Sequence, residues 1–395
     1  MTTTLSPDQA RALWEAGGFA LLTGLPMGSE TGMDGTFHTI NVFAGHKFVP
    51  PGLHSVVWSA TPTSSSSTTT PSSTEGKPQS EASASADIAA AFPIRSAFLH
   101  FWQPKERVVL HYDPATESTT RKPGSPPIDE AELQALDPQM APYPFAQLAA
   151  WKSLSTHITP PVLVRVCPSG RVDSLTAAAG EEGDEIKELR AAVNKGAATN
   201  AAAGEPLAFP VFDLKRSWNE GASGEEVTRW SRDKSMLLAR VCAEVGGPAA
   251  LLGHLQLSHI LVSQVWSYAS LSPYKRLLRL LCRSESALAD PAAVGLPQST
   301  RDVYIALLST LAAQLRALPN AAFDTELPDM REFYELEIDA LRKGLGHALG
   351  ERGWWGKVGE VGAKWKDLQA AAADKGLVLL EVSAGDEDSD EEEVL

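Results

Sequence analysis

Three side chains in the first third of the chain have the residue types of a metal site. They are His100, His111 and Asp113, and two imidazoles with one carboxylate form the donor set that non-haem iron oxygenases use. His111 and Asp113 share one face of a β-strand, whereas His100 lies on another strand and joins them only in one register. A half-solvated sheet explains the same residues without a metal. We therefore predict no metal site, and a metal-dependent oxygenase is the less favoured alternative.

A second pattern, the run GLGHALG from Gly344 to Gly350, approximates the glycine motif that binds dinucleotides. That motif works at a turn from a strand into a helix, where backbone N–H groups point at the pyrophosphate. Here the spacing differs and the run follows a helical pattern. No P-loop, G-x-S-x-G or H-E-x-x-H motif occurs in the sequence. We predict that the protein is not an enzyme and needs no cofactor.

The stretch from residue 249 to residue 268 is the most apolar part of the chain. Its large apolar residues fall on nearly every side of a helix, so little of it can face water: Leu251, Leu252, Leu255, Ile260, Leu261, Val262, Val265 and Trp266. The stretch has the length of a membrane span, but histidines, glutamines and serines interrupt it. We predict a core helix and no membrane partner.

Further helical patterns cover residues 223–245, 273–283, 303–315, 328–350 and 354–373. With the central stretch they predict an all-α domain over residues 207–374 that is built as a helical layer. The pattern over 273–283 carries four basic residues between its apolar positions, and we expect them to form an exposed stripe: Lys275, Arg276, Arg279 and Arg283. A solvated face is the simpler interpretation of this stripe, and a partner-binding face is the other.

The first part of the chain has the pattern of a β-rich domain. Short strands are predicted over residues 19–25, 37–43, 53–60, 94–102 and 108–112, with turns at Gly24, Gly28, Gly32 and Gly35. We predict a β-sandwich-like domain over residues 1–158, in which residues 61–86, almost wholly Ser, Thr, Pro, Ala and Glu, form a disordered insert. Residues 159–206 are predicted to be the interdomain linker, because their composition shifts to Ala, Gly and Glu. The fold class is therefore α+β.

The formal net charge of the chain is −15, which argues against nucleic acid as the partner. Binding a polyanion requires clustered lysines and arginines, whose contacts release counterions from the phosphates. The three cysteines, Cys167, Cys242 and Cys282, are widely spaced, and the N-terminal residues lack the basic and apolar runs of a signal peptide. We expect a cytoplasmic and nuclear protein.

Four blocks of the sequence resemble, in wording and in order, the A1-cistron splicing factor family. They are residues 24–34 with 48–60, residues 96–113, residues 141–158, and residues 252–288, the last containing YKRLL and LCRSE. Together they cover somewhat under half of the chain. The resemblance implies a β-sandwich-like domain followed by a helical, VHS-like domain.

The same resemblance implies a function without catalysis. Members of this family are assembly chaperones of the U5 small nuclear ribonucleoprotein in pre-mRNA splicing. They bind the RNase H-like and MPN-type regions of the large central U5 protein and keep the U5 helicase from docking too early. A generic helical adaptor that binds short peptides is the alternative function.

The tail, residues 375–395, begins with an apolar and β-prone run: Leu377, Val378, Leu379, Leu380, Glu381 and Val382. Such a run can add a strand to the sheet edge of a partner, and the family resemblance favours this interpretation. The alternative is that it pairs with the chain's own sheet or folds back on the helices. Ser389 follows in an acidic segment of the kind that acidophilic kinases phosphorylate. We expect a phosphate there to weaken docking of the tail.

Overall fold

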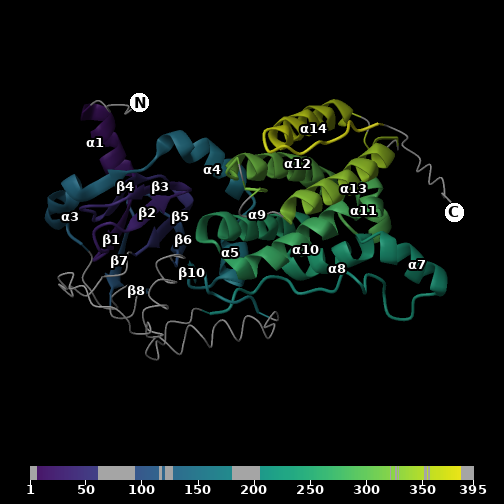
Figure 1. Cartoon of the computed structure of the whole chain (residues 1–395), viewed down its shortest axis with the longest axis horizontal. Coiled ribbons are helices and arrows are strands. Elements are labelled where there is room, and N and C mark those ends of the chain that lie inside the picture. Colours follow the sequence, from purple (N-terminus) through teal and green to yellow (C-terminus); the bar gives the residue numbers. More distant parts are fainter. Residues whose placement is uncertain are drawn as a thin grey trace, which may run out of the picture.

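The computed structural model describes residues 7–60, 94–114, 118–120, 128–179, 205–320, 322–324, 327, 329–350, 354 and 356–383. Two bodies lie side by side in it, a β-rich body formed by the first part of the chain and a helical body formed by the rest (Figure 1). This confirms the predicted α+β class and the order of its two parts.

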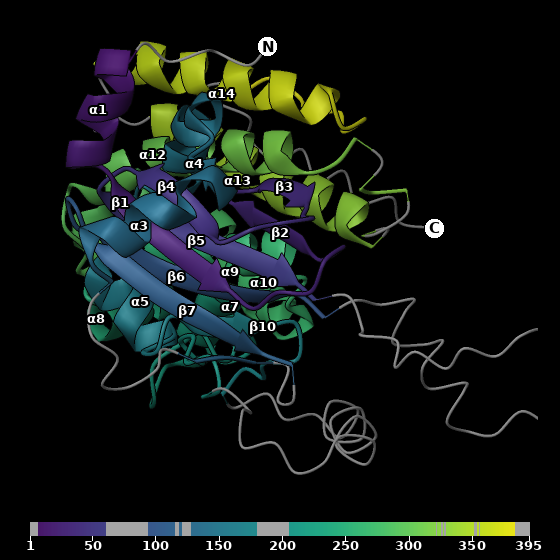
Figure 2. The ribbon, with the colours of Figure 1, turned by 90° about the vertical axis from the view of Figure 1, so that its left-hand side faces the viewer.

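The β-rich body contains two five-stranded sheets. One has the order β8-β7-β1-β4-β9, with β1 at Gly18–Thr23, β4 at Gly45–Val49, β7 at Arg107–Asp113, β8 at Ser118–Thr120 and β9 at Met140–Pro142. The other has the order β10-β6-β5-β2-β3, with β2 at Glu30–Met33, β3 at Thr36–Thr39, β5 at Gly52–Ser59, β6 at Ser96–Trp102 and β10 at Arg171–Asp173. Figure 2 shows these strands in front of the helical body.

The two sheets pack face to face, and β1 is buried on both of its sides. Ala20 and Leu22 join the core between the sheets, whereas Phe19 and Leu21 pack on the other side with Leu133 of α3. Burial on both faces explains why the first predicted strand is a continuous apolar run. The short helices of this body are α1 (Pro7–Ala16), α3 (Glu130–Leu136), η1 (Asp137–Gln139), η2 (Phe145–Gln147), α4 (Leu148–Ser155) and α5 (Pro160–Val166).

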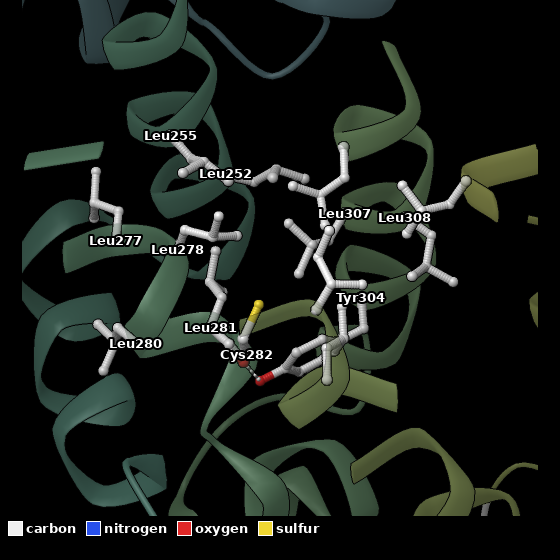
Figure 3. Close-up of a cluster of buried hydrophobic side chains, with 14 of the residues drawn as sticks. Leu252, Leu255, Leu277, Leu278, Leu280, Leu281, Cys282, Tyr304, Leu307 and Leu308 are labelled. Carbon is white, nitrogen blue, oxygen red and sulfur yellow. Dashed lines mark hydrogen bonds between the residues drawn. The ribbon is translucent and has the colours of Figure 1, made fainter. Parts of the chain in front are cut away.

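The helical body is built around α9 (Pro248–Val265), of which 13 of 18 residues are buried. Around it are α7 (Gly224–Arg232), α8 (Ser235–Val245), η3 (Tyr268–Ser270), α10 (Leu271–Cys282), α11 (Glu285–Ala289), η4 (Pro291–Val294), α12 (Thr300–Ala317), α13 (Met330–Gly350) and α14 (Val358–Ala373). Leucines of α9, α10 and α12 interdigitate in its core, and Tyr304 donates its hydroxyl to the carbonyl of Leu281 at 3.2 Å (Figure 3).

Helix α9 contributes to two cores. Leu252 and Leu255, in its first half, pack inside the helical body. Ile260 and Leu261, in its second half, pack against Leu53 of β5 and against residues of β6, α4 and α5. No single helix among the described residues is long and apolar enough to span a membrane, and α8 with α9 meets that criterion only as a pair bent by 86°.

The linker predicted over residues 159–206 is wrong in its first part. Pro160 and Pro161 occupy the first turn of α5, where the missing N–H of proline costs nothing, so they begin a helix instead of interrupting the chain. Strand β10 then pairs with β6. Residues 180–204, and the insert predicted over residues 61–86, lie outside the described residues.

The helix predicted over residues 223–245 is also corrected, because it is divided into α7 and α8. The predicted capping box at its start is confirmed, since Ser223 and Glu226 each bond to the other's backbone N–H. Asp233 ends α7 in an extended conformation and accepts a hydrogen bond from the backbone N–H of Ser235 at 2.9 Å. This bond starts α8 in a new direction.

Candidate partner-binding site

The tail runs back along the helical body as an extended segment beside α14 (Figure 1). Leu377 is 2% exposed, and its backbone N–H donates to the carbonyl of Ala372 at 3.0 Å. Leu379 and Val382 are partly buried against the large helical core, whereas Val378 is 81% and Leu380 61% exposed. The tail thus buries one side and leaves apolar side chains of the other side in solvent.

Three side chains of the helical body hold carbonyl groups of the tail. The indole N–H of Trp365 donates to Leu380 at 3.0 Å, the amide of Gln369 donates to Leu379 at 3.0 Å, and Arg342 donates to Glu381 at 3.4 Å. The acceptors are consecutive main-chain carbonyls of an extended segment. The helices therefore hold the tail chiefly through its backbone carbonyls.

The glycine run from Gly344 to Gly350 has its explanation at the same place. Gly346, on α13, lies where the tail crosses this helix, and an added Cβ atom would be 2.6 Å from the carbonyl oxygen of Ser383. The run is part of α13, and no strand precedes it. A glycine at this position permits close approach of two backbones, which is a structural role.

The tail is therefore folded back on the helices, which is one of the alternatives that we considered from the sequence. None of its described residues pairs with a strand of the sheets. Its role as a strand added to a partner stays a prediction. Ser389, the candidate phosphorylation site, lies outside the described residues.

The basic residues of α10 are half-buried, which corrects the expectation of a fully exposed stripe. The Nε atoms of Arg279 and Arg283 lie 2.6 Å and 2.8 Å from the two carboxylate oxygens of Glu337, a residue of α13 with no exposed side-chain surface. A buried carboxylate is stable only when it is paired, so these two arginines stabilise the fold by neutralising Glu337. The ammonium group of Lys275 lies 5.4 Å from the ring of Phe333, and the guanidinium of Arg276 lies 5.8 Å from the ring of Phe212.

A buried polar network occupies the side of the β-rich body that faces α9, and sequence patterns did not reveal it. One carboxylate oxygen of Asp34 lies 2.5 Å from Nδ1 of His54 and accepts a hydrogen bond from the Tyr143 hydroxyl at 2.6 Å. The other accepts from the backbone N–H of Ser55 at 2.9 Å. The hydroxyl of Ser55 then donates to Gln264 of α9 at 2.9 Å, so the network links the two bodies.

An imidazole next to a carboxylate supplies two of the three members of a catalytic triad, but this pair is buried away from solvent. Asp34, His54 and Tyr143 are each 2% exposed, and the third member is a tyrosine instead of an activated nucleophile. Burial, together with the charge of Asp34, raises the pKa of Tyr143 far above its usual range, so its hydroxyl stays a donor. Asp34 also has a positive φ of 52°, unusual for a residue other than glycine. The arrangement fixes a turn and a domain contact.

The C-terminal end of α9 is held by residues of the β-rich body. The guanidinium of Arg95 lies 4.4 Å from the ring of Phe37 and 3.7 Å from the ring of Trp266, and it donates to the carbonyl of Gln264 at 3.2 Å. The hydroxyl of Ser174 donates to Val265 at 2.8 Å. Both acceptors are carbonyls of the last helical turn, which have no partner within the helix. The two bodies are therefore joined by specific polar contacts as well as by a shared core.

The residues first considered as an iron site do not come together. His100 is on β6 of one sheet, where its Nε2 lies 2.9 Å from Glu106, whereas His111 is on β7 of the other sheet, where its Nδ1 lies 3.1 Å from the hydroxyl of Thr23. Asp113 lies on β7 with His111. Among the described residues no group of three or more His, Cys, Asp or Glu side chains is placed to hold a metal ion.

Comparison with known proteins gives matches along both bodies. Residues 16–168 match the family model of the AAR2 N-terminal domain, and residues 209–377 match that of the AAR2 C-terminal repeat region. The chain is 26% identical over 344 residues to Protein AAR2 homolog of Mus musculus, a match that covers 80% of this chain and 79% of the mouse protein.

Two further relatives carry the same name. The chain is 26% identical over 340 residues to the Homo sapiens protein, with 80% of this chain and 79% of that protein covered. It is 21% identical over 345 residues to the Caenorhabditis elegans protein, with 82% and 85% covered. The second family match ends at Leu377, the first residue of the apolar run in the tail.

Proposed function

Because this chain belongs to the AAR2, or A1-cistron splicing factor, family, we propose that it acts in pre-mRNA splicing as a non-catalytic assembly chaperone of the U5 small nuclear ribonucleoprotein. Its partner in this proposal is the large central U5 protein, of which it binds the RNase H-like and MPN-type regions. The proposed sites of action are the cytoplasm and the nucleus.

The tail is the observation that carries the proposal of a protein partner. From Leu377 to Leu380 its buried and exposed side chains alternate at the period of a β-strand, and the exposed ones, Val378 and Leu380, are apolar. An extended segment of this kind gains main-chain hydrogen bonds when it is added to a sheet edge, and its outward side chains fill pockets of the partner. The tail has the side chains for this role on its outer side.

The proposed mechanism is steric. A partner region that is occupied by this protein cannot offer the same surface to the U5 helicase, so helicase docking waits until the chaperone leaves. Direct binding to RNA is not part of the proposal. The formal charge of the chain is −15, and Arg279 and Arg283 are committed to Glu337. Neither observation favours RNA as the partner, since a polyanion is bound through clustered free cations.

The proposal is tested by binding of the RNase H-like and MPN-type regions to the full chain and to a Val378→Asp/Leu380→Asp double variant. Both side chains face solvent, so the variant should fold normally, while its affinity should fall at least about tenfold because two charges would enter apolar pockets. Val211→Asp is the matched control, since Val211 is 55% exposed and lies outside the tail.

Truncation gives a second test. The truncated chain should lack residues 378–395 and keep Leu377, because Leu377 is buried in the helical core. Loss of binding on truncation supports the proposal. Full affinity of both the truncated chain and the double variant would contradict it and favour the alternative, a helical adaptor that binds peptides elsewhere.

A further inference from the structure

Strand β3 is an edge strand with one side free of any neighbouring strand. It is the last strand of its sheet and pairs with β2 alone. A two-residue turn joins the two strands, so Thr36 and His38 are the residues that exchange hydrogen bonds with β2. Ile40 continues this alternation, because its N–H donates to the carbonyl of Ser29 at 2.9 Å.

The residues of β3 between these positions direct their main-chain groups outward. The N–H and carbonyl groups of Phe37 and Thr39 point away from β2, and none of them has a backbone partner among the residues that the structure describes. A row of unpaired main-chain groups is a template for another extended chain. Thr36 and Thr39, at the two ends of β3, are both exposed, so the edge is accessible from solvent.

The other edge strands of the two sheets have features that oppose such pairing. Strand β9 contains Pro142, which has no N–H, and β10 contains the charged residues Arg171 and Asp173. In β8 the carbonyl of Thr119 already accepts a hydrogen bond from the guanidinium of Arg171 at 2.6 Å. Strand β3, with the sequence Thr-Phe-His-Thr, contains no proline, lysine, arginine or carboxylate. Its edge is therefore the one that can take up a further strand.

A pocket of about 200 Å³ lies on one face of this edge, between the two sheets. Thr36 and His38 of β3 form one of its walls, and Ala141, Pro142 and Pro144, at the edge of the other sheet, form another. Pockets for drug-sized ligands measure roughly 300–1,000 Å³, so this one is suited to a single side chain.

The pocket is uncharged, although two histidines line it. Burial lowers the pKa of His38, and it lowers the pKa of His46 to about 3, so both imidazoles are neutral at pH 7. No other residue of the pocket wall is ionisable. An apolar side chain matches these walls, whereas a carboxylate or an ammonium group would lose its hydration there without gaining a charge partner.

The opposite face of the same edge carries an aromatic stack. Phe37 packs toward α9, and the guanidinium of Arg95 contacts both its ring and the ring of Trp266. Trp266 is 47% exposed and has a positive φ of 59°, which is rare for a bulky side chain. Backbone strain of this kind is concentrated at functional sites. The edge thus has an apolar pocket on one face and an exposed aromatic ring on the other.

We propose that the open edge of β3 binds an extended, uncharged segment of a partner protein as an additional strand. The outward groups of Phe37 and Thr39 supply the main-chain hydrogen bonds. Side chains of a strand alternate between its faces, so one apolar side chain of the segment enters the pocket while its neighbours in sequence lie toward Phe37 and Trp266. The tail takes no part, and the inference does not rest on the function proposed for it.

The test is titration of the full chain with a capped heptapeptide of alternating threonine and leucine, followed by NMR. We expect a Kd of about 10–500 µM and slower hydrogen exchange of the N–H groups of Phe37 and Thr39. Exchange at His38, which already bonds to β2, should not change. Absence of binding up to about 2 mM, or binding that leaves the Phe37 and Thr39 groups unprotected, would overturn the proposal.

A heptapeptide of alternating threonine and aspartate is the control for the probe. It has the same main-chain groups but would place a carboxylate in the uncharged pocket, so we expect no measurable binding. Equal affinity of the two peptides would overturn the assignment of an apolar segment.

Substitution at Thr39 tests the main-chain pairing. Thr39→Pro removes an outward N–H and leaves the bonds to β2 intact, because proline is tolerated at such edge positions. It should weaken binding of the leucine peptide at least about tenfold. Thr39→Val keeps the N–H and should bind the peptide like the unchanged chain. Equal affinity of the two variants would contradict pairing at β3.

Two variants at the faces of the edge keep the test decisive if Thr39→Pro fails to fold. Ala141→Leu fills the pocket, and Trp266→Asn removes the aromatic ring with a residue that tolerates the positive φ. Each should weaken peptide binding about fivefold. Leu336→Asn is the control, since Leu336 is 52% exposed on α13. Unchanged affinity in both face variants would overturn the proposal.

Two other occupants of the edge give different results. If residues of the same chain covered it, exchange of the Phe37 and Thr39 N–H groups would be slow before any peptide is added. If a second copy covered it, light scattering would show a dimer that Thr39→Pro converts to a monomer. Either result would overturn the assignment to a partner protein.

Discussion

Gly346 of α13 and Ser383 of the tail lie so close together that a Cβ atom at position 346 would be 2.6 Å from the Ser383 carbonyl oxygen. Real Cβ atoms do not approach an oxygen so closely, and that oxygen belongs to the backbone, so the tail would have to move. The end of the tail is thus docked on a helix by the absence of a side chain.

Gly346→Ala should release the end of the tail without harming α13. Alanine is favoured over glycine inside a helix by about 1 kcal/mol, so the helix itself gains stability. Hydrogen exchange of the Trp365 indole N–H, which donates to the carbonyl of Leu380, should become faster. Affinity for the proposed U5 partner should rise, because less free energy is needed to release the tail from the helices.

Gly344→Ala is the control for this prediction. The nearest heavy atom to an added Cβ at position 344 is a methyl carbon of Leu288 at 3.9 Å, an ordinary contact. This variant should gain the same helix propensity and leave exchange of the Trp365 indole N–H unchanged. Equal exchange rates in the two variants would show that the contact does not hold the tail.

The pair of arginines on Glu337 should prove important for stability. Arg279→Ala/Arg283→Ala leaves the carboxylate of Glu337 buried without a charge partner. The expected loss is about 3 kcal/mol in the free energy of unfolding, at the low end for a buried pair because both guanidiniums are partly exposed. Denaturant unfolding measures it.

Adding Glu337→Leu to that double variant should restore most of the stability, since the unpaired charge is then removed. If the triple variant were no more stable than the double variant, the contact of Arg279 with the ring of Phe333 would be the main contribution.

Asp34→Asn should weaken the contact between the two bodies. Asparagine has the same shape and tolerates the positive φ at this position, but it lacks the charge that strengthens the bonds from His54 and Tyr143. We expect a loss of about 2 kcal/mol in unfolding free energy. Tyr143→Phe removes only one donor and should cost about 1 kcal/mol, so the reverse order of the two losses would contradict the assigned roles.

Stability should fall in mildly acidic solution because of buried histidines. Burial lowers the pKa of His46 and His259 to about 3, and burial with Arg165 lowers that of His254 to about 4. As the pH falls below about 6.5, these residues take up protons in the unfolded chain but not in the native one. Each should therefore reduce the unfolding free energy by up to about 1.4 kcal/mol per pH unit until its native pKa is reached.

Denaturant unfolding between pH 7 and pH 4 checks this, with His259→Gln as the comparison. Carboxylates also titrate in this range, so the difference between the two slopes carries the information. The unfolding free energy of the variant should change less steeply with pH, because one histidine no longer takes up a proton on unfolding. Identical slopes in the two proteins would contradict a neutral, buried His259.

Local sequence patterns were sufficient to predict those elements that are buried on all sides. The stretch that became α9 is apolar on nearly every side, and only burial from all directions satisfies such a helix. Strand β1 is predictable for the same reason. The prolines at 160 and 161 were misleading because the same residues end one element or begin another, depending on what packs behind them.

The parts of the site that were missed depend on distant residues. Asp34 meets His54 across 20 positions and Tyr143 across 109, and no periodicity signals such a meeting. Strand β2 lies in the glycine-rich block interpreted as turns, because Gly32 is needed where a Cβ atom would be 2.5 Å from the carbonyl oxygen of Thr36. The tail was recognisable as extended, but Trp365 and Gln369 became visible as its holders only in the folded chain.

Helix α9 contributes side chains to the core of the helical body and to the core at the β-rich body, so it fixes the distance between the two bodies. Since the first half of α9 is embedded in one body and its second half in the other, neither body can swivel without unpacking leucines. A partner that binds both bodies must therefore fit the distance between them that α9 sets. Calorimetry should record a single melting transition, although the two bodies match two separate family models.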